Sequence, residues 1–363
     1  MVTYTDKIKE LEDKITNTKY NKRTQHAIGL YKAQLAKLKE KQESRGKGGG
    51  KSEGYSVRKT GDGTVLLLGF PSVGKSTLLN EITNANSEVG AYDFTTLNVI
   101  PGLMEYKHAK IQILDVPGVV RGAASGKGRG REVLSVMRNA DLVLIIIDAN
   151  YPEHLPILLN EVRDAHIRIN QKRPDVKIKK TMKDGIRIGA TVKLSLNQIT
   201  IKAVLNEFKI NNADVVIRED ISVDELIDCI EDNKKYLPGI IAINKADTVS
   251  DKKLKVVVKK INAEITISAK EKRGINEIKD LIFKKLNFMR IWMKEPGKEA
   301  DMNEPLIITN DSTIKDVCQK LHKDMVRLFK FARVTGPSAK FPGQKLSLNH
   351  TLKDNDVLEI HLT

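Results

Sequence analysis

The sequence predicts an α/β fold built around a mostly parallel β-sheet, with smaller units added before, within and after the sheet-forming region. From Thr64 onward, short apolar segments alternate with segments of helical periodicity, which is the pattern of a parallel α/β sheet. Each apolar segment ends in a polar motif, as expected where ligands bind outside the carboxyl ends of the strands. The length of 363 residues, 40% of them apolar, suffices for two or three domains of ~100–200 residues.

Composition limits the classes of function. The chain has 62 basic and 46 acidic residues, a net charge of +16, which is typical of a protein with an anionic partner; a lysine-rich solvated surface is the alternative. Cys229 and Cys318 stand far apart without a CxxC pair, which supports neither a disulfide framework nor a cysteine zinc site and favours a reduced, cytoplasmic setting. The longest apolar run, Leu142–Ile147, is far shorter than the ~20 residues of a membrane helix, so we expect no membrane association.

The first 60 residues concentrate positive charge, with 15 basic and 7 acidic residues. Apolar residues recur there at helical spacing in two runs, first Ile8, Leu11 and Ile15, then Ile28, Tyr31, Leu35 and Leu38. The spacing predicts two helices joined near residues 21–23, followed by a flexible, basic, glycine-rich linker at 44–54. This arm is interpreted either as a contact for an RNA backbone or as a solvated helix face.

The expected strands of the sheet are Val65–Leu68, Ile111–Asp115, Leu142–Asp148, Ile240–Asn244 and Glu264–Ser268. The interval between the third and the fourth is longer than one crossover helix requires, which indicates an insertion. Its first part, 168–202, has 10 basic and 2 acidic residues. Alternation of apolar and polar residues predicts strands there at Val176–Lys179, Val192–Leu196 and Ile199–Ile201.

The last part of the chain predicts a sheet wrapped around one helix. The expected strands are Pro305–Ile308, Phe331–Val334 and Val357–Leu362. Ser312 is expected to cap the helix, with Cys318 and Leu321 turned inward. Basic residues alternate with apolar ones between 327 and 345, so one sheet face is either an RNA-binding surface or an ordinary half-buried face.

Gly69–Ser76 matches the phosphate-binding pattern G-x-x-x-x-G-K-[ST], directly after an apolar strand and at the start of a helical segment. In such a loop the backbone amides turn toward phosphate oxygens, Lys75 supplies a point charge to the β- and γ-phosphates, and Ser76 can ligate Mg²⁺. Asp115-Val-Pro-Gly118 offers a carboxylate for the metal and a glycine amide for the γ-phosphate. Phe94-Thr-Thr96 lies in an expected loop, where the hydroxyl of Thr96 can complete the metal shell.

Asn244-Lys-Ala-Asp247 indicates which base is bound. The carboxylate of Asp247 can accept hydrogen bonds from both N1–H and the amino group of guanine, whereas adenine offers no such pair of donors. Ser268-Ala-Lys270 follows the fifth strand, and its backbone amides are expected to face guanine O6. The motifs together predict a site for a guanine nucleotide.

With these motifs the chain resembles the Obg-like superfamily of P-loop GTPases. More narrowly, Gly69–Thr77, Tyr92–Leu97, Asp115–Gly118 and the glycine-rich Gly126–Arg131 resemble the developmentally regulated GTP-binding protein family of archaea and eukaryotes, and the resemblance extends over essentially the whole chain. It implies a helix-turn-helix-like arm and linker at 1–60, a GTPase domain in two parts at 61–165 and 229–288, an inserted α+β lobe at 166–228, similar to a domain of a small-subunit ribosomal protein, and a β-grasp TGS domain at 289–363.

The resemblance also implies a Mg²⁺-dependent switch that binds GTP and GDP, hydrolyses GTP, associates with ribosomes and ribosomal RNA in translation, and has a dedicated regulatory protein. We expect a cytoplasmic monomer. Two alternatives stay open at the level of sequence: an RNA-binding adaptor in which the nucleotide is mainly structural, and a GTPase of ribosome assembly. We expect Lys75, Thr96 and Gly118 to act in catalysis, and Ser76, Thr96 and Asp115 to hold the metal. The residues expected to contact the nucleotide are Gly69, Pro71, Ser72, Val73, Gly74, Lys75, Ser76, Thr77, Asn244, Lys245, Asp247, Ser268, Ala269 and Lys270.

Val119 follows Asp115–Gly118 where many small GTPases have a water-orienting glutamine, and its side chain can neither donate a hydrogen bond to water nor accept one. Related GTPases with an apolar residue there use a potassium ion held partly by an asparagine of the phosphate loop. Ser72 occupies that place, and its hydroxyl is also an oxygen ligand, so potassium is a candidate cofactor. Four basic residues nearby are expected either to stabilise charge in cis or to contact a partner or RNA: Arg121, Lys127, Arg129 and Arg131.

Overall fold

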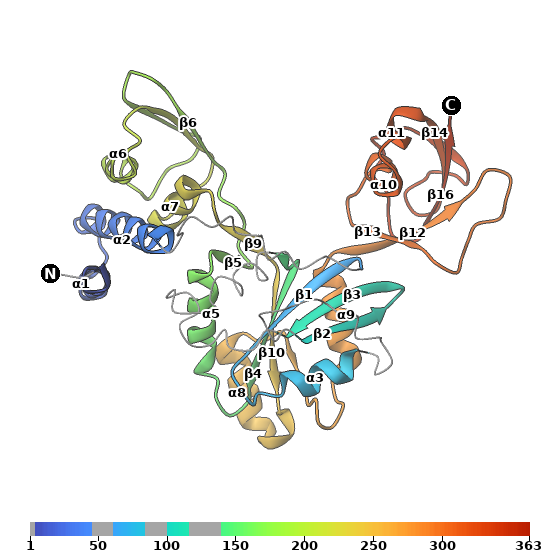
Figure 1. The fold of residues 1–363 in the computed structure, drawn as a ribbon, viewed down its shortest axis with the longest axis horizontal. Coiled ribbons are helices and arrows are strands. Elements are labelled where there is room, and N and C mark those ends of the chain that lie inside the picture. Colours follow the sequence, from blue (N-terminus) through green and yellow to red (C-terminus); the bar gives the residue numbers. More distant parts are fainter. Residues whose placement is uncertain (1–3, 46–60, 84–99, 116–138) are drawn as a thin grey trace. The chain divides into compact units, whose positions relative to one another are not determined.

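A computed structural model describes residues 4–45, 61–83, 100–115 and 139–363 of the chain (Figure 1). They belong to two compact units. One unit combines residues 1–54 with residues 166–236, and the other combines residues 55–165 with residues 237–363. In the described part of the chain, no helix has the length and apolar character needed to cross a membrane.

The second unit contains a six-stranded sheet with the order β11-β10-β4-β1-β3-β2 (Figure 1). Five strands run parallel, namely β1 (Gly63–Leu68), β3 (Ala109–Asp115), β4 (Leu142–Asp148), β10 (Gly239–Asn244) and β11 (Ile265–Thr266). The parallel-rich sheet predicted from the sequence is therefore confirmed, although β11 is shorter than expected. The sixth strand, β2 (Ile100–Tyr106), pairs antiparallel with β3 and was not predicted from the sequence. Its Pro101 and Gly102 disfavour a strand, but an edge strand tolerates proline.

Helices cover both faces of this sheet. Apolar side chains of α3 (Lys75–Ile82) and α9 (Ile275–Lys285) join those of the central strands in one core. The other face carries α5 (His154–Asp164) and α8 (Asp251–Ile261) (Figure 1). Every residue of β1 and β4 is buried, which explains why these strands read as continuous apolar runs.

The C-terminal part of the second unit is a five-stranded sheet with the order β13-β12-β16-β14-β15. Its strands are β12 (Phe288–Lys294), β13 (Leu306–Thr309), β14 (Phe329–Thr335), β15 (Gln344–Leu346) and β16 (Asp356–Leu362). They form one core with α10 (Ile314–Leu321), and the short α11 (Met325–Leu328) packs beside it. The prediction of a sheet wrapped around one helix is confirmed.

Two details of α10 differ from the prediction. The N-cap is Thr313 rather than Ser312, because the Thr313 hydroxyl accepts from the amide of Asp316 and the Asp316 carboxylate accepts from the amide of Thr313. Cys318 is buried as expected, but Leu321 is 40% exposed. Leu321 is the last residue of the helix, so it lies at the margin of the core.

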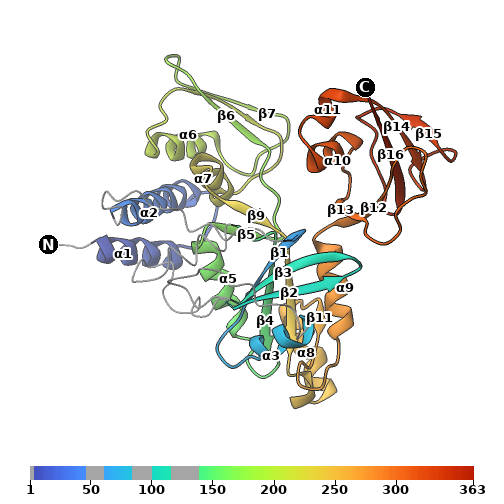
Figure 2. The same cartoon turned by 45° about the vertical axis from the view of Figure 1, so that its right-hand side comes forward.

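The first unit joins a helical hairpin to a small α+β lobe (Figure 2). The hairpin consists of α1 (Tyr4–Asn17) and α2 (Gln25–Arg45), as the apolar spacing predicts. The lobe has a three-stranded sheet with the order β6-β8-β7, made of β6 (Val176–Lys180), β8 (Ala213–Ile217) and β7 (Ile186–Ala190). Its helices are α6 (Gln198–Glu207) and α7 (Val223–Glu231), and a second small sheet pairs β5 (Ile167–Ile169) with β9 (Lys235–Leu237).

The helical hairpin packs against this lobe. Ala33 of α2 is fully buried within the apolar core of the lobe. The side-chain amide of Gln25 donates to the carbonyl of Ser195 at 3.1 Å and accepts from the amide of Asn197 at 3.2 Å. Lys37 lies 2.9 Å from the carboxylate of Glu207. The helical hairpin and the lobe therefore form one compact unit.

The lobe also corrects two predicted strands. Val192–Leu196 is not a strand, and Ile199–Ile201 belongs to α6. The side chain of Asn197 accepts from the amide of Ile199 and caps the helix, while buried residues recur at helical spacing: Thr200, Ile201, Val204 and Leu205. The β-branched residues suggested a strand, but the cap and the burial of one helix face outweigh that preference.

Candidate functional site

The phosphate loop connects β1 to α3, as the sequence predicts. Gly74 has φ +91°, and a Cβ atom there would lie 2.5 Å from the side-chain nitrogen of Asn244. Only glycine meets both conditions without strain. Lys75 is the first residue of α3, and its Nζ donates to the carbonyls of Gly69 at 3.0 Å and Phe70 at 3.1 Å. The amine is thus held along the inside of the loop, next to a helix N-terminus, where phosphate oxygens would be bound.

The expected metal ligands Ser76 and Asp115 lie together beside Lys75. The Ser76 hydroxyl is 3.4 Å from Oδ2 of Asp115, and Oδ1 of Asp115 is buried without a hydrogen-bond partner among the described residues. Burial raises the pKa of Asp115, while Lys75 and Ser76 oppose that shift; burial lowers the pKa of Lys75, and Asp115 opposes it. A hydroxyl beside an unpaired carboxylate oxygen suits Mg²⁺, which commonly takes one or two protein ligands plus phosphate oxygens.

Asn244 connects three predicted motifs. Its side chain is almost completely buried, at 2% exposure of the residue. The side-chain nitrogen donates to the carbonyl of Val73 in the phosphate loop at 2.8 Å, and the side-chain oxygen accepts from the amide of Ala269 at 3.0 Å. The structure therefore brings the phosphate loop, Asn244–Asp247 and Ser268–Lys270 into one hydrogen-bonded group.

Asp247 is the exposed carboxylate of this group. The hydroxyl of Ser268 donates to its Oδ1 at 2.6 Å, and this bond lowers the pKa of Asp247. The backbone amides at 268–270 were predicted to face guanine O6, but two of them already donate within the protein. The amide of Ser268 donates to the carbonyl of Arg273, and that of Ala269 donates to the side-chain oxygen of Asn244. The amide of Lys270 has no acceptor within the described ranges and is the one that stays available to a base.

Asp148, the last residue of β4, also lies at this site and was not predicted from the sequence. Its side chain is 6% exposed, and its Oδ2 lies 2.8 Å from the amine of Lys245. Its Oδ1 accepts from the amide of Asn150 at 2.9 Å, and the Asn150 side chain also donates to the hydroxyl of Thr248. Burial acts to raise the pKa of Asp148, but Lys245 and Asn150 together lower it. Asp148 stands at the carboxyl end of a buried strand, the one sequence signal that points to it.

Several predicted residues lie outside the described part of the chain. They are Thr96, Gly118, Val119 and the basic residues Arg121, Lys127, Arg129 and Arg131, together with the ranges Tyr92–Leu97 and Gly126–Arg131. Within the described part, Pro71, Ser72 and Thr77 are exposed on the phosphate loop and α3, and Ser72 has φ +63°.

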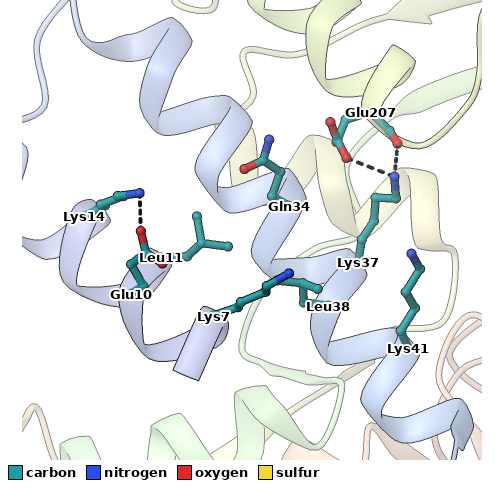
Figure 3. Close-up of a pocket in the computed structure, with 9 residues that line it drawn as sticks. All are labelled: Lys7, Glu10, Leu11, Lys14, Gln34, Lys37, Leu38, Lys41 and Glu207. Carbon is teal, nitrogen blue, oxygen red and sulfur yellow. Dashed lines mark hydrogen bonds and ion pairs between the residues drawn. The ribbon is translucent and has the colours of Figure 1, made fainter. Parts of the chain in front are cut away.

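A separate cavity of about 360 Å³ lies in the first unit (Figure 3). It is lined by residues of α1 and α2, together with Glu207 of α6. Two of its lysines already have acidic partners, because Lys14 pairs with Glu10 and Lys37 pairs with Glu207. None of the predicted nucleotide-binding residues lines this cavity.

Comparison with known families agrees with the fold and the motifs. Residues 64–180 match the family described as 50S ribosome-binding GTPase, and residues 183–288 match the C-terminal region of that domain. Residues 289–362 match the TGS domain. The second unit therefore contains a P-loop GTPase domain and a C-terminal TGS domain, as predicted.

Full-length relatives occur in archaea and eukaryotes. An uncharacterised GTP-binding protein of Methanocaldococcus jannaschii is 49% identical over 360 residues, which cover 98% of this chain and 92% of the relative. Developmentally-regulated GTP-binding protein 1 of Xenopus laevis is 42% identical, with 98% of both chains covered. Ribosome-interacting GTPase 1 of Saccharomyces cerevisiae is 41% identical, with 99% of both covered. The chain belongs to the developmentally regulated GTP-binding protein family.

Proposed function

We propose that the chain binds GTP and GDP at the site described above and hydrolyses GTP in the presence of Mg²⁺. The observation that carries this proposal is the position of Asn244, which bonds to Val73 on one side and Ala269 on the other. These contacts support the proposal because they hold the residues assigned to the phosphates and those assigned to the base at the same edge of the sheet. The proposal predicts hydrolysis of GTP but not ATP by the purified chain, and loss of hydrolysis when Mg²⁺ is chelated; equal hydrolysis of GTP and ATP would contradict it.

The roles of individual residues follow from their chemistry. The backbone N–H groups of residues 69–74, except that of Pro71, which has none, and the amine of Lys75 would bind phosphate oxygens, with Thr77 beside them at the start of α3. Ser76 and Asp115 would hold the metal, and the unpaired buried oxygen of Asp115 supports this assignment. We assign Thr96 to the same metal shell and the amide of Gly118 to the γ-phosphate. Bound Mg²⁺ would neutralise negative charge that develops on the phosphates.

The guanine base would lie between the exposed carboxylate of Asp247 and the amide of Lys270. Asp247 would accept from N1–H and the amino group, and Lys270 would donate to O6. Lys245 and Ala269 would bound the base pocket, with Lys245 held by Asp148.

Asp148→Asn is expected to weaken GDP binding by roughly threefold to tenfold. The substitution keeps the shape of the side chain but removes the negative charge that holds the amine of Lys245. The dissociation constant is measured with a fluorescent GDP analogue, and kcat at saturating GTP should change little. Asp280→Asn is a matched control. Asp280 also pairs with a lysine, because its Oδ1 lies 2.6 Å from the amine of Lys107, but this pair is not part of the proposed site. Equal affinities in both variants and the wild type would contradict the positioning role of Asp148.

Potassium is proposed as a second cation, with Ser72 as one ligand. The hydroxyl of Ser72 is exposed on the phosphate loop in a left-handed backbone conformation, and Val119 provides no group that orients water. GTP turnover should be faster in KCl than in NaCl at matched ionic strength, and Ser72→Ala should reduce the difference. Equal rates in the two salts would exclude this role.

We further propose that the GTPase acts on ribosomes and contacts ribosomal RNA in the cytoplasm, as a monomer assisted by a regulatory protein. The yeast relative is named a ribosome-interacting GTPase, and the matched family is described as binding the 50S subunit. The positive charge of the chain is suited to an RNA partner. Hydrolysis-linked release from ribosomes would separate this switch from an adaptor whose nucleotide is mainly structural, and a requirement during subunit maturation would instead indicate ribosome assembly.

A further inference from the structure

The charges of residues 166–236 divide into paired and unpaired groups. Each arginine in this range pairs with an aspartate: Arg168 with Asp228, Arg173 with Asp232, Arg187 with Asp214, and Arg218 with Asp175. Every other acidic residue in the range also has an ion-pair or hydrogen-bond partner. The positive charge without a partner therefore belongs to lysines.

Four of these lysines follow one another along β6 and the turn after it: Lys177, Lys179, Lys180 and Lys183. All four are exposed, and the side-chain amine of none of them has an ion-pair or hydrogen-bond partner within the residues that the structure describes. Met182 lies among them with its side chain fully exposed. We call the four lysines the β6 lysine row.

The sheet presents part of this row on a bare face. Alternate residues of the strands, such as Ile178, Ile188 and Val215, belong to the apolar core that also contains residues of α6 and α7. Lys177 and Lys179 are on the opposite face, at the edge of the sheet. Their partners on the neighbouring strand β8 are Val216 and Asp214, respectively. The carboxylate of Asp214 forms an ion pair with Arg187 of β7.

The spacing of Lys177 and Lys179 suits successive phosphates of a nucleic acid strand. Residues two positions apart in a strand are about 7 Å apart, which is close to the distance between successive phosphates along a nucleic acid strand. No aromatic residue occurs in β6, β7 or β8, so this face offers no stacking platform for bases. Its chemistry is suited to the backbone of a nucleic acid rather than to its sequence.

We propose that the β6 lysine row binds the phosphate backbone of RNA. The inference rests on the proposed contact with ribosomal RNA and names the surface that makes it. Lysines on an edge strand can also serve only to prevent pairing with other strands, a role that requires no ligand. The two roles differ in the dependence of RNA binding on salt, because each phosphate contact releases counterions.

The test uses the full chain in which all four lysines of the row are replaced by glutamine: K177Q, K179Q, K180Q and K183Q. Binding of a short fluorescein-labelled RNA duplex is measured by anisotropy at about 50 to 200 mM KCl. We expect at least a tenfold loss of affinity, and the slope of log K against log salt should decrease by about one for each lysine that contacts a phosphate. Replacement of the same four residues by arginine should retain binding, because the charge is preserved.

A matched control replaces four exposed lysines of α8 by glutamine: Lys252, Lys253, Lys255 and Lys259. It removes the same charge and should leave both affinity and slope unchanged. A circular dichroism spectrum and a thermal unfolding curve like those of the wild type show that each variant is folded, including the lobe that carries β6. If the wild type binds neither ribosomes nor the duplex, the proposed contact with ribosomal RNA itself is wrong. The inference is overturned if the wild type binds ribosomes but not the duplex, or if the β6 variant keeps the wild-type affinity and slope.

Discussion

Asp247→Asn is expected to move the nucleotide preference from guanosine to xanthosine triphosphate. The carboxylate would accept from two donors of guanine, whereas an amide presents one donor group that suits the additional oxygen of xanthine. A binding site strongly rejects a ligand that leaves its polar groups without hydrogen-bond partners. Because the substitution leaves the guanine donors unpaired, GTP affinity should fall on the order of 100-fold or more. Competition against a fluorescent nucleotide gives the affinities for both triphosphates.

The structure supplies a graded control for this substitution. Ser268→Ala keeps the carboxylate and removes the hydroxyl that donates to it at 2.6 Å. Because that bond lowers the pKa of Asp247, its loss should raise the pKa, so that GTP binding in the variant declines at a higher pH on acidification than in the wild type. Near neutral pH, GTP affinity should fall only modestly and no xanthosine preference should appear. Unchanged GTP affinity in Asp247→Asn would contradict the assignment of the base pocket.

Lys75→Ala is expected to abolish GTP turnover, with a loss on the order of 10³-fold or more. The amine lies inside the phosphate loop, where it donates to two carbonyls of that loop. Its removal leaves the β- and γ-phosphates without a point charge in a site where burial strengthens electrostatic interactions. Single-turnover hydrolysis of radiolabelled GTP measures the chemical step directly.

The control for Lys75→Ala is Lys253→Ala, which removes an exposed lysine from α8. It should hydrolyse GTP at the wild-type rate. Folding of Lys75→Ala is checked by its thermal unfolding curve. If that variant keeps GTP turnover, the assignment of the phosphate site is wrong.

The sheet strands and their motifs could be predicted because short segments encode them. The pattern Gly69–Ser76 lies next to a strand and a helix that are both apolar enough to be recognised, and Asn244–Asp247 follows another such strand. Contacts between the motifs, such as that of Asn244 with Val73, were not required for the prediction, although the structure shows that they hold the site together.

Asp148 could not be identified in the same way. Its importance depends on Lys245, which lies almost one hundred residues later in the sequence and meets it only because β4 and β10 are neighbours in the sheet. A single aspartate at a strand end has no motif around it. The position becomes significant only when the parallel pairing is known.

The lobe shows the limits of periodicity. Residues 199–201 alternate in a way that suits a strand, yet the cap at Asn197 and the burial of Val204 and Leu205 make them helical. The packing of Ala33 into the same core also depends on contacts between distant segments. Such long-range contacts override local preference, and a single sequence does not reveal them.

Co-sedimentation with purified ribosomes, in GDP and in a non-hydrolysable GTP analogue, tests the proposed function most directly. The comparison is made at low and at moderate salt, because contacts with RNA weaken as salt rises. The proposed switch predicts that more of the chain sediments with ribosomes in the GTP analogue than in GDP, and that the difference is absent in Asp247→Asn. Equal sedimentation with both nucleotides, or none with either, would contradict a nucleotide-controlled association with the ribosome.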